Sequence, residues 1–299
     1  MCGQKFKRLF FIILLLALWL DCHKQKITKT WDDLYPVWSP DGRYIAFFRN
    51  FNFGIDPPYI VDTLSGIRIL NWPTLVVLDS FVKHIAFDWM SNGEELLCGG
   101  LSIINVKTKY VKEIKPEGDS CLGYAWANLS PDGARILYVC WAPDSNWISM
   151  TDTLGSYAKK LFHSAWAPAW HPSGNSFIFI SNSNNQYHVC VGDTAGNIIR
   201  VLGIDIGAWG LYNGYVSFSP DGSKIVYSRV QLPSGGLNNY EIHLCDSLGE
   251  NDIKLTSGCQ PYWSPDGDKI VFARWSEEDS LFSLWVINTD GTNIIKITE

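Results

Sequence analysis

Four aspartates of this chain stand in the same phrase, Ser-Pro-Asp-Gly, and they are the first residues to consider for chemistry. They are Asp41, Asp132, Asp221 and Asp266. Carboxylates that recur at one place in a fold could form an acidic ring that binds a metal ion. The same aspartate can instead be a turn residue that accepts hydrogen bonds from nearby backbone, with the glycine supplying a positive φ. The recurrence favours the turn, because residues common to every repeat usually maintain the repeat.

Histidines and cysteines show no spacing typical of a metal site or an activated nucleophile. The six histidines are scattered, and the chain contains no CxxC, HExxH or GxSxG. Six cysteines lie beyond Cys22, and the sequence does not choose among their fifteen pairings. Four stand inside apolar runs and are interpreted as small buried hydrophobes: Cys98, Cys140, Cys190 and Cys245. The sequence therefore predicts no catalytic residue, no cofactor and no metal site.

The turn phrase, intact or altered, occurs six times and organises the chain. Its glycines are Gly42, Gly93, Gly133, Gly174, Gly222 and Gly267, at spacings of 51, 40, 41, 48 and 45 residues. An alternating apolar run precedes and follows each turn, and a second strand–turn–strand unit follows some 15 to 20 residues later, as in "YIVDTLSGIRIL" from Tyr59. Four antiparallel strands per repeat of this length are typical of a propeller blade. We therefore expect an all-β, six-bladed β-propeller.

One aromatic residue occupies the same place before most of these turns. Five of the six copies have it: Trp38, Trp89, Trp170, Phe218 and Trp263. An aromatic side chain at a fixed site in each blade is what packing between neighbouring blades requires. The alternative, an aromatic ligand cage, would use the same repetition.

The first residues form a separate unit. Three basic residues precede twelve apolar residues, "LFFIILLLALWL", which end at Asp21. This pattern favours a secretory signal over a spanning helix, which needs about 20 apolar residues. Cys22 directly after the run resembles the lipid-attachment cysteine of bacterial lipoproteins, with an uncleaved anchor or simple secretion as alternatives. We expect a signal or anchor over 1–21, a linker or edge strand over 22–34, and the propeller over 35–299.

Composition limits the classes of partner. Aromatic residues make up 14% of the chain and charged residues only 18%, so most of the aromatic surface must be buried in a large core. The formal net charge is -6, and no basic run follows the N-terminus. Nucleic acid is a poor partner for such a chain, because phosphate neutralisation needs clustered Lys and Arg.

The repeat resembles that of TolB-like propellers, relatives of WD repeats, whose signature is an aromatic residue, Ser-Pro-Asp-Gly and an Ile-Ala-Phe-like strand. The resemblance covers roughly residues 27–299, and four of the six copies keep Ser-Pro-Asp-Gly intact. It implies the propeller fold, while the N-terminal pattern predicts an exported protein that is periplasmic or membrane-anchored. Propellers of this kind serve as protein-binding modules, in envelope complexes, or as gating domains of peptidases, so the resemblance leaves the function open.

Because successive strands of a blade run in opposite directions, alternate connections lie at the same end of the propeller, and this predicts where a partner would bind. Connections from the second to the third strand, and from each blade to the next, lie at one end of the propeller, which we call the long-loop end. The tight turns lie at the other end. Aromatic residues of the long connections are expected at or near the long-loop end, on a partner-binding face. They are Phe51, Phe53, Trp72, Trp166, Trp209, Tyr212 and Trp275.

Three hypotheses of function follow. The first is a non-enzymatic, exported binding or scaffold propeller that recognises a protein partner in the cell envelope through the long-loop end. The second is a propeller enzyme that acts on carbohydrate or peptide with loop carboxylates such as Asp56, Asp205, Glu277 or Glu278. The third is a structural envelope protein without a specific ligand.

Overall fold

The computed structural model describes residues 31–51, 65–82, 85–142, 145–183, 186–207, 215–231 and 239–298. Cys22 and the N-terminal apolar run lie outside the described residues. Within these ranges the secondary structure is β-strand and turn, and no helix is long and apolar enough to cross a membrane.

Six sheets of four antiparallel strands follow one another along the chain. Blade 1 comprises β1 (Trp31–Trp38), β2 (Tyr44–Phe51), β3 (Gly66–Asn71) and β4 (Val76–Val82). Blade 2 comprises β5 (Ala86–Trp89), β6 (Glu95–Cys98), β7 (Ser102–Asn105) and β8 (Val111–Glu113). Blade 3 comprises β9 (Gly123–Leu129), β10 (Arg135–Ala142), β11 (Ser145–Asp152) and β12 (Lys159–His163).

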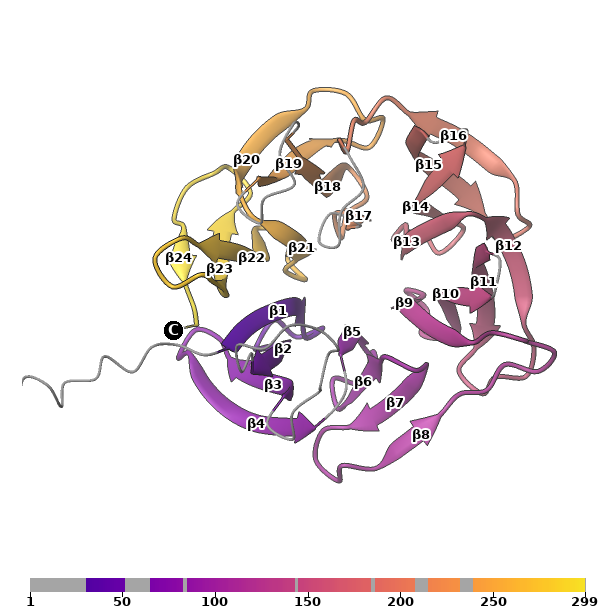
Figure 1. Cartoon of the computed structure of the whole chain (residues 1–299), viewed down its shortest axis with the longest axis horizontal. Coiled ribbons are helices and arrows are strands. Elements are labelled where there is room, and N and C mark those ends of the chain that lie inside the picture. The colour runs from indigo at the N-terminus through magenta and orange to yellow at the C-terminus, as the bar shows by residue number, and fades with distance from the viewer. Residues whose placement is uncertain are drawn as a thin grey trace, which may run out of the picture. The chain divides into compact units, whose positions relative to one another are not determined.

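The second half of the ring has the same form. Blade 4 comprises β13 (Ala165–Trp170), β14 (Ser176–Ser183), β15 (Gln186–Asp193) and β16 (Ile198–Leu202). Blade 5 comprises β17 (Val216–Phe218), β18 (Lys224–Val230), β19 (Tyr240–Asp246) and β20 (Ile253–Ser257). Blade 6 comprises β21 (Cys259–Trp263), β22 (Lys269–Ser276), β23 (Leu281–Asn288) and β24 (Ile295–Lys296). The blades surround a central axis (Figure 1), so the expected six-bladed β-propeller is confirmed.

The Ser-Pro-Asp-Gly phrase closes the turn between the first two strands of a blade. In blade 1 the Ser39 hydroxyl donates to Asp41 Oδ1 (2.7 Å) and accepts from the Tyr44 N–H (2.9 Å). Gly42 has a φ of 69° and donates its N–H to the Ser39 carbonyl. The turns that contain Asp132 and Gly133, Asp221 and Gly222, and Asp266 and Gly267 have the same pattern. The serine, whose part was not expected from the sequence, joins both sides of the turn.

The aromatic residue before the turn packs between blades, as expected. Trp89 is 3% exposed and lies in a core cluster with blade 1 residues such as Ala46 and Ile67. Its indole Nε1 donates to the Val37 carbonyl of blade 1 at 3.3 Å. Trp170 and Trp263 donate in the same way to the preceding blade, at Asn128 and Ser217. The hydrophobic core is thus divided among the contacts between neighbouring blades.

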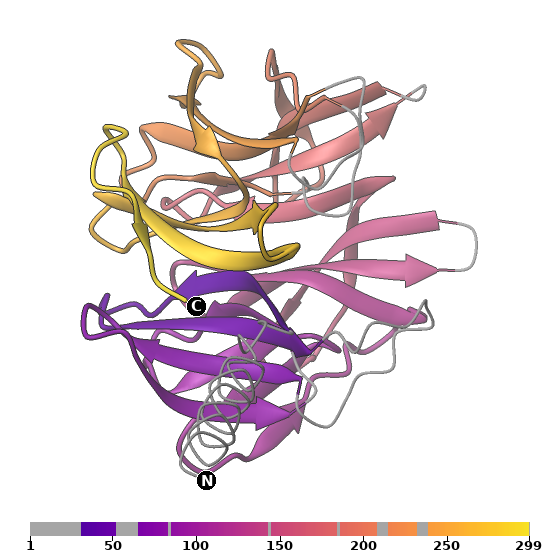
Figure 2. The ribbon, with the colours of Figure 1, turned by 60° about the vertical axis from the view of Figure 1, so that its left-hand side comes forward.

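Blades 1 and 6 close the ring by packing against each other (Figures 1 and 2). Asp32 Oδ1 accepts a hydrogen bond from the Phe282 N–H of blade 6 at 2.8 Å. The Tyr35 N–H donates to Gln260 Oε1 of blade 6 at 2.7 Å. Trp31, which falls within the range 22–34 expected as a linker or edge strand, begins β1 and pairs with β2.

One strand assignment from the sequence is wrong. "YIVDTLSGIRIL" was expected to hold the third and fourth strands of blade 1, but Ile67 to Leu70 pair with β2 and form the third. The fourth strand is β4, and the turn before it is closed by the Leu75 N–H donating to the Asn71 carbonyl. The third strand begins only at Gly66, and the turn that follows it lacks the Asp-Thr signal, which together account for the shift.

Candidate binding site

The inner strands of all six blades line a cavity of about 80 Å³ on the propeller axis. Its walls are formed by the residues that lie two to four positions before the turn between the first and second strands of each blade. The residue four positions before the turn differs from blade to blade: Tyr35, Ala86, Trp126, Ala167, Tyr215 and Gln260. Blades 1, 3 and 5 thus supply large aromatic side chains, and blades 2, 4 and 6 smaller ones. The residue at this position therefore differs in size around the ring.

The backbone at this position is also unusual. Tyr35, Trp126, Ala167 and Gln260 have φ values of 55°, 45°, 51° and 55°, a left-handed region that non-glycine residues rarely occupy. In each of these four strands the pairing register shifts at the same place. A β-bulge of this kind turns a side chain away from the regular alternation of the strand. The bulges therefore place variable side chains at the cavity.

A buried carboxylate holds the walls of the cavity together. Asp88 Oδ2 accepts hydrogen bonds from Asn128 Nδ2 and the Leu129 N–H, both at 3.0 Å. Asp88 Oδ1 accepts from the Tyr262 hydroxyl at 2.8 Å and from the Trp89 N–H at 2.9 Å. Burial raises the pKa of Asp88 to about 6, although these donors favour the charged form. The carboxylate links blade 2 to blades 3 and 6.

An exposed apolar patch lies at the long-loop end of blade 3. It consists of Leu122, Trp126 and Trp141, and we call it the blade 3 patch. Leu122 is 76% exposed and Trp141 is 39% exposed. The Leu122 N–H donates to the Trp141 carbonyl at 2.7 Å, and the rings of Trp126 and Trp141 lie 6.1 Å apart. Trp126 is half-buried and also lines the cavity.

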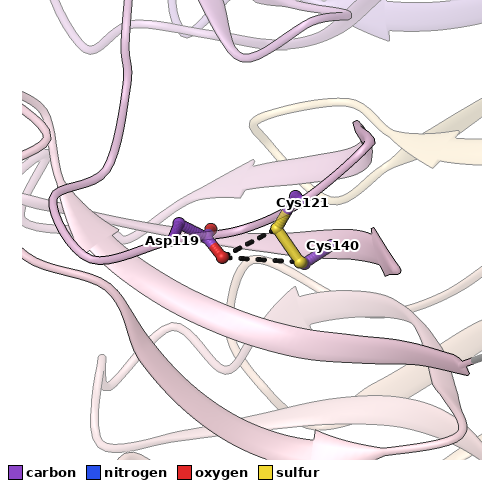
Figure 3. Close-up of side chains that lie close together, drawn as sticks. All are labelled: Asp119, Cys121 and Cys140. Atoms are coloured by element: carbon purple, nitrogen blue, oxygen red, sulfur yellow. Dashed lines mark hydrogen bonds between the residues drawn. A yellow bond between two sulfur atoms is a disulfide. The ribbon is translucent and has the colours of Figure 1, made fainter. Parts of the chain in front are cut away.

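A disulfide holds the patch in place. Cys121 and Cys140 are bonded, and each immediately precedes one of the exposed residues, Leu122 and Trp141 (Figure 3). Asp119 lies beside both sulfurs, 2.8 Å and 3.5 Å from Oδ1, and its Oδ2 accepts from the Tyr138 hydroxyl at 2.6 Å. The bridge and the Asp119 contacts fasten the connection from blade 2 to β10.

The same three side chains have the spacing of a metal site. Their ligand atoms lie within 4.8 Å of one another. A metal binds cysteine as the thiolate, and sulfurs joined in a disulfide do not offer one. The bonded cysteines therefore act as a covalent clip. Cys140 was interpreted as a small buried hydrophobe; it is buried, and it is also half of this bridge, while Cys98, Cys190 and Cys245 are free and buried.

Several residues expected at the binding face lie outside the described residues. They are Phe53, Trp209, Tyr212 and the side chain of Phe51. Their assignment to the face stays a prediction.

Trp72 does not lie at the long-loop end. It is in the turn between β3 and β4, at the end that carries the Ser-Pro-Asp-Gly turns. Its ring packs edge-on against Trp38 at 5.4 Å, against the core between blades 1 and 6. The placement from the sequence was wrong because it took this turn for a connection between blades.

Trp166 and Trp275 lie at the long-loop end, and both are half-buried. Trp166 is the second residue of β13, 6.2 Å from the ring of Tyr187, and packs on the same core clusters as Trp126. Trp275 is the penultimate residue of β22 and packs edge-on against Phe282, with their ring centres 5.2 Å apart. Trp166 thus packs against the cores beside blade 4, and Trp275 packs within blade 6.

The loop carboxylates of the enzyme hypothesis have ordinary surroundings where they are described. Asp205 is paired with Arg229 at 2.9 Å and is 69% exposed. Glu277 and Glu278 are exposed in the connection from β22 to β23. Asp56 lies outside the described residues. Asp205 therefore has a surface ion pair of the kind that adds little stability.

No known family profile matches the chain, but solved structures share its fold. A TolB from Agrobacterium tumefaciens superposes with a TM-score of 0.57 at 16% identity, over 89% of this chain and 80% of its own. TolB from Acinetobacter baumannii matches with a TM-score of 0.50 at 20% identity, over 90% of this chain and 55% of its own. A gluconolactonase from Xanthomonas campestris matches with a TM-score of 0.57 at 9% identity, over 82% of this chain and 84% of its own.

These likenesses define the class of protein. The chain has the six-bladed β-propeller fold seen in the TolB structures, in agreement with the resemblance of its repeat. The same fold also carries a lactonase, so the fold alone does not separate a binding propeller from an enzyme. The function must be argued from the site.

Proposed function

We propose that this protein is a non-enzymatic binding propeller that recognises a protein partner through the blade 3 patch at its long-loop end. The observation that carries the proposal is the exposure of Leu122 and Trp141, 76% and 39%, on a support fixed by the disulfide. Tryptophan is enriched at the centres of protein interfaces, and Trp141 accepts a backbone hydrogen bond from the exposed Leu122.

The rigidity of the patch supports the proposal. Binding is weakened when side chains and loops must be ordered, so a patch that is fixed beforehand binds with a smaller entropic cost. Three restraints act here: the Cys121–Cys140 bridge, the Tyr138–Asp119 hydrogen bond, and the Leu122–Trp141 backbone hydrogen bond.

We further propose that the protein is exported and works in the cell envelope, tethered by its N-terminal segment or by lipid on Cys22. Two features support this: the charged and apolar N-terminal pattern, and a disulfide, which persists in oxidising compartments. Intact-mass analysis of protein from membranes tests the lipid. A diacylglycerol mass on Cys22 is expected, and its absence would leave only the uncleaved anchor or simple secretion.

The partner proposal is tested by comparing two leucines of blade 3. Leu122 is at the long-loop end, and Leu154, 72% exposed, is in the turn between β11 and β12 at the opposite end. Leu122→Glu is expected to abolish crosslinked capture of the envelope partner, and Trp141→Ala to reduce it at least tenfold, as for interface hot spots. Leu154→Glu is the matched control and should capture as much as the wild type. Equal capture by all variants would refute the site.

A further inference from the structure

The Asp119 carboxylate is held against the two sulfurs of the bridge by groups other than the sulfurs. Its Oδ2 accepts from the Tyr138 hydroxyl at 2.6 Å, and its Oδ1 accepts from the Ser120 N–H at 3.0 Å. Oδ1 then lies 2.8 Å from Cys121 Sγ and 3.5 Å from Cys140 Sγ (Figure 3). The carboxylate is therefore oriented toward the sulfurs before any ligand binds.

The closed bridge does not use this orientation. A sulfur in a disulfide carries no hydrogen, so the contacts drawn to the sulfurs in Figure 3 become hydrogen bonds only when the cysteines are reduced. In the described part of the chain, no Lys, Arg or His forms an ion pair with Asp119. One carboxylate oxygen and two sulfurs thus meet within 4.8 Å of one another. This geometry fits a pair of reduced cysteines, with their protons or with a shared cation.

Opening the bridge turns the same three side chains into metal ligands. A dithiol reductant gives two electrons and two protons to the disulfide and leaves as its own disulfide, so that Cys121 and Cys140 become thiols. A divalent metal ion then displaces the two thiol protons, since thiolate is the form that binds metal. The Cα atoms of the two cysteines are 5.3 Å apart. Both thiolates can therefore reach one zinc ion at about 2.3 Å, with Asp119 Oδ1 at about 2.1 Å.

The kinds of ligand select the metal. Two thiolates favour zinc over magnesium or calcium, which prefer oxygen ligands only. Asp119 and Cys121 are half-buried while Cys140 is buried, so the cluster is in reach of solvent and a water molecule can complete a tetrahedral zinc site. The Tyr138 hydroxyl would keep the carboxylate in place, as hydrogen-bond partners of metal ligands commonly do.

We propose that the reduced chain binds one zinc ion through Cys121 Sγ, Cys140 Sγ and Asp119 Oδ1, so that this cluster is a disulfide when oxidised and a zinc site when reduced. The site lies beside the blade 3 patch, because Leu122 follows Cys121 directly. Zinc binding is measured without a protein partner, so a negative result would overturn the zinc site and leave the partner proposal to its own test.

Zinc titration of the full chain in two redox states tests the site. One sample is reduced with dithiothreitol and freed from it without oxygen, and the other stays oxidised. Both compete for Zn²⁺ with a chromophoric chelator. The reduced chain is expected to bind one zinc ion more than the oxidised chain, and Co²⁺ in its place should give the charge-transfer absorption of thiolate ligands. Equal zinc uptake in the two states, or none by the reduced chain, would overturn the proposal.

Variants identify the ligands. In the reduced state Cys121→Ala/Cys140→Ala should lose this zinc ion, whereas Cys98→Ala, which removes a free buried cysteine outside the cluster, should keep it. Asp119→Asn leaves both cysteines in place, so it remains informative if the double variant folds poorly. It should bind zinc about tenfold more weakly or worse, because even the hydrogen-bond partners of metal ligands contribute that much. Asp205→Asn, in a surface ion pair, is the matched control. Wild-type zinc affinity in a folded double variant or in Asp119→Asn would refute the site.

Discussion

Removing the Cys121–Cys140 disulfide tests the support of the blade 3 patch. The bridge joins residues 19 apart in the sequence. For a loop of that length, the loss of chain entropy in the unfolded state amounts to about 3 kcal/mol of stability. The double variant Cys121→Ala/Cys140→Ala is therefore expected to lower the free energy of unfolding by about 3 kcal/mol.

Urea unfolding measures this loss, compared between the wild type with and without reductant and the double variant. Reductant should bring the wild type to the midpoint of the variant. Cys98→Ala is the control, because Cys98 is a buried free cysteine: its variant loses packing but keeps its sensitivity to reductant. The double variant should also capture less partner, because Leu122 and Trp141 follow the two cysteines. A wild type whose midpoint does not respond to reductant would refute the reasoning.

Three further predictions concern the channel, the core and the turns. Tyr262→Phe removes a hydrogen bond to the charged form of Asp88, so the pKa of Asp88, about 6 in the wild type, should rise in an NMR titration. A pKa raised in the folded state favours folding at low pH. The contribution of Asp88 to the free energy of unfolding should therefore increase as pH falls from about 6 toward 3.8 and be lost as pH rises. Gly192→Ala should cost about 1–3 kcal/mol in urea unfolding, since a Cβ there would lie 2.6 Å from the Phe162 ring. Hydrogen bonds within its turn lower the pKa of Asp221 to about 2. The stability that Asp221→Ala removes should therefore be present above pH 3.8 and be lost as pH falls toward 2. At that pH the wild type and the variant should unfold at the same urea concentration. A constant difference across that range would contradict the last of these.

The sequence was sufficient for the architecture because each blade repeats the same local chemistry. Ser-Pro-Asp-Gly closes a turn by contacts within five residues, and the tryptophan before it packs on the neighbouring blade wherever the ring closes. The error in blade 1 arose where the local signal stops. The residues from Ile67 to Leu70 have a pattern that fits either the third or the fourth strand of a blade. Only their pairing with β2 identifies them as the third strand.

The sites were much harder to read, because they depend on residues far apart in the chain. Leu122 and Trp141 gave one faint signal, an apolar residue directly after each of two cysteines, but the sequence did not pair those cysteines. Asp88 meets Tyr262 across 174 positions, and the Gln260 amide acquires its orientation from Tyr35, across 225. Such contacts exist only once the ring has closed.

The most direct test of the proposed function is photo-crosslinking in cells from single positions of blade 3. A photoreactive phenylalanine analogue replaces Leu122 at the long-loop end or Leu154 at the turn end, two leucines of similar exposure, 76% and 72%. We expect a discrete crosslinked protein from position 122 and none from position 154. The same crosslinks from both positions, or none from position 122, would contradict a partner site at the blade 3 patch.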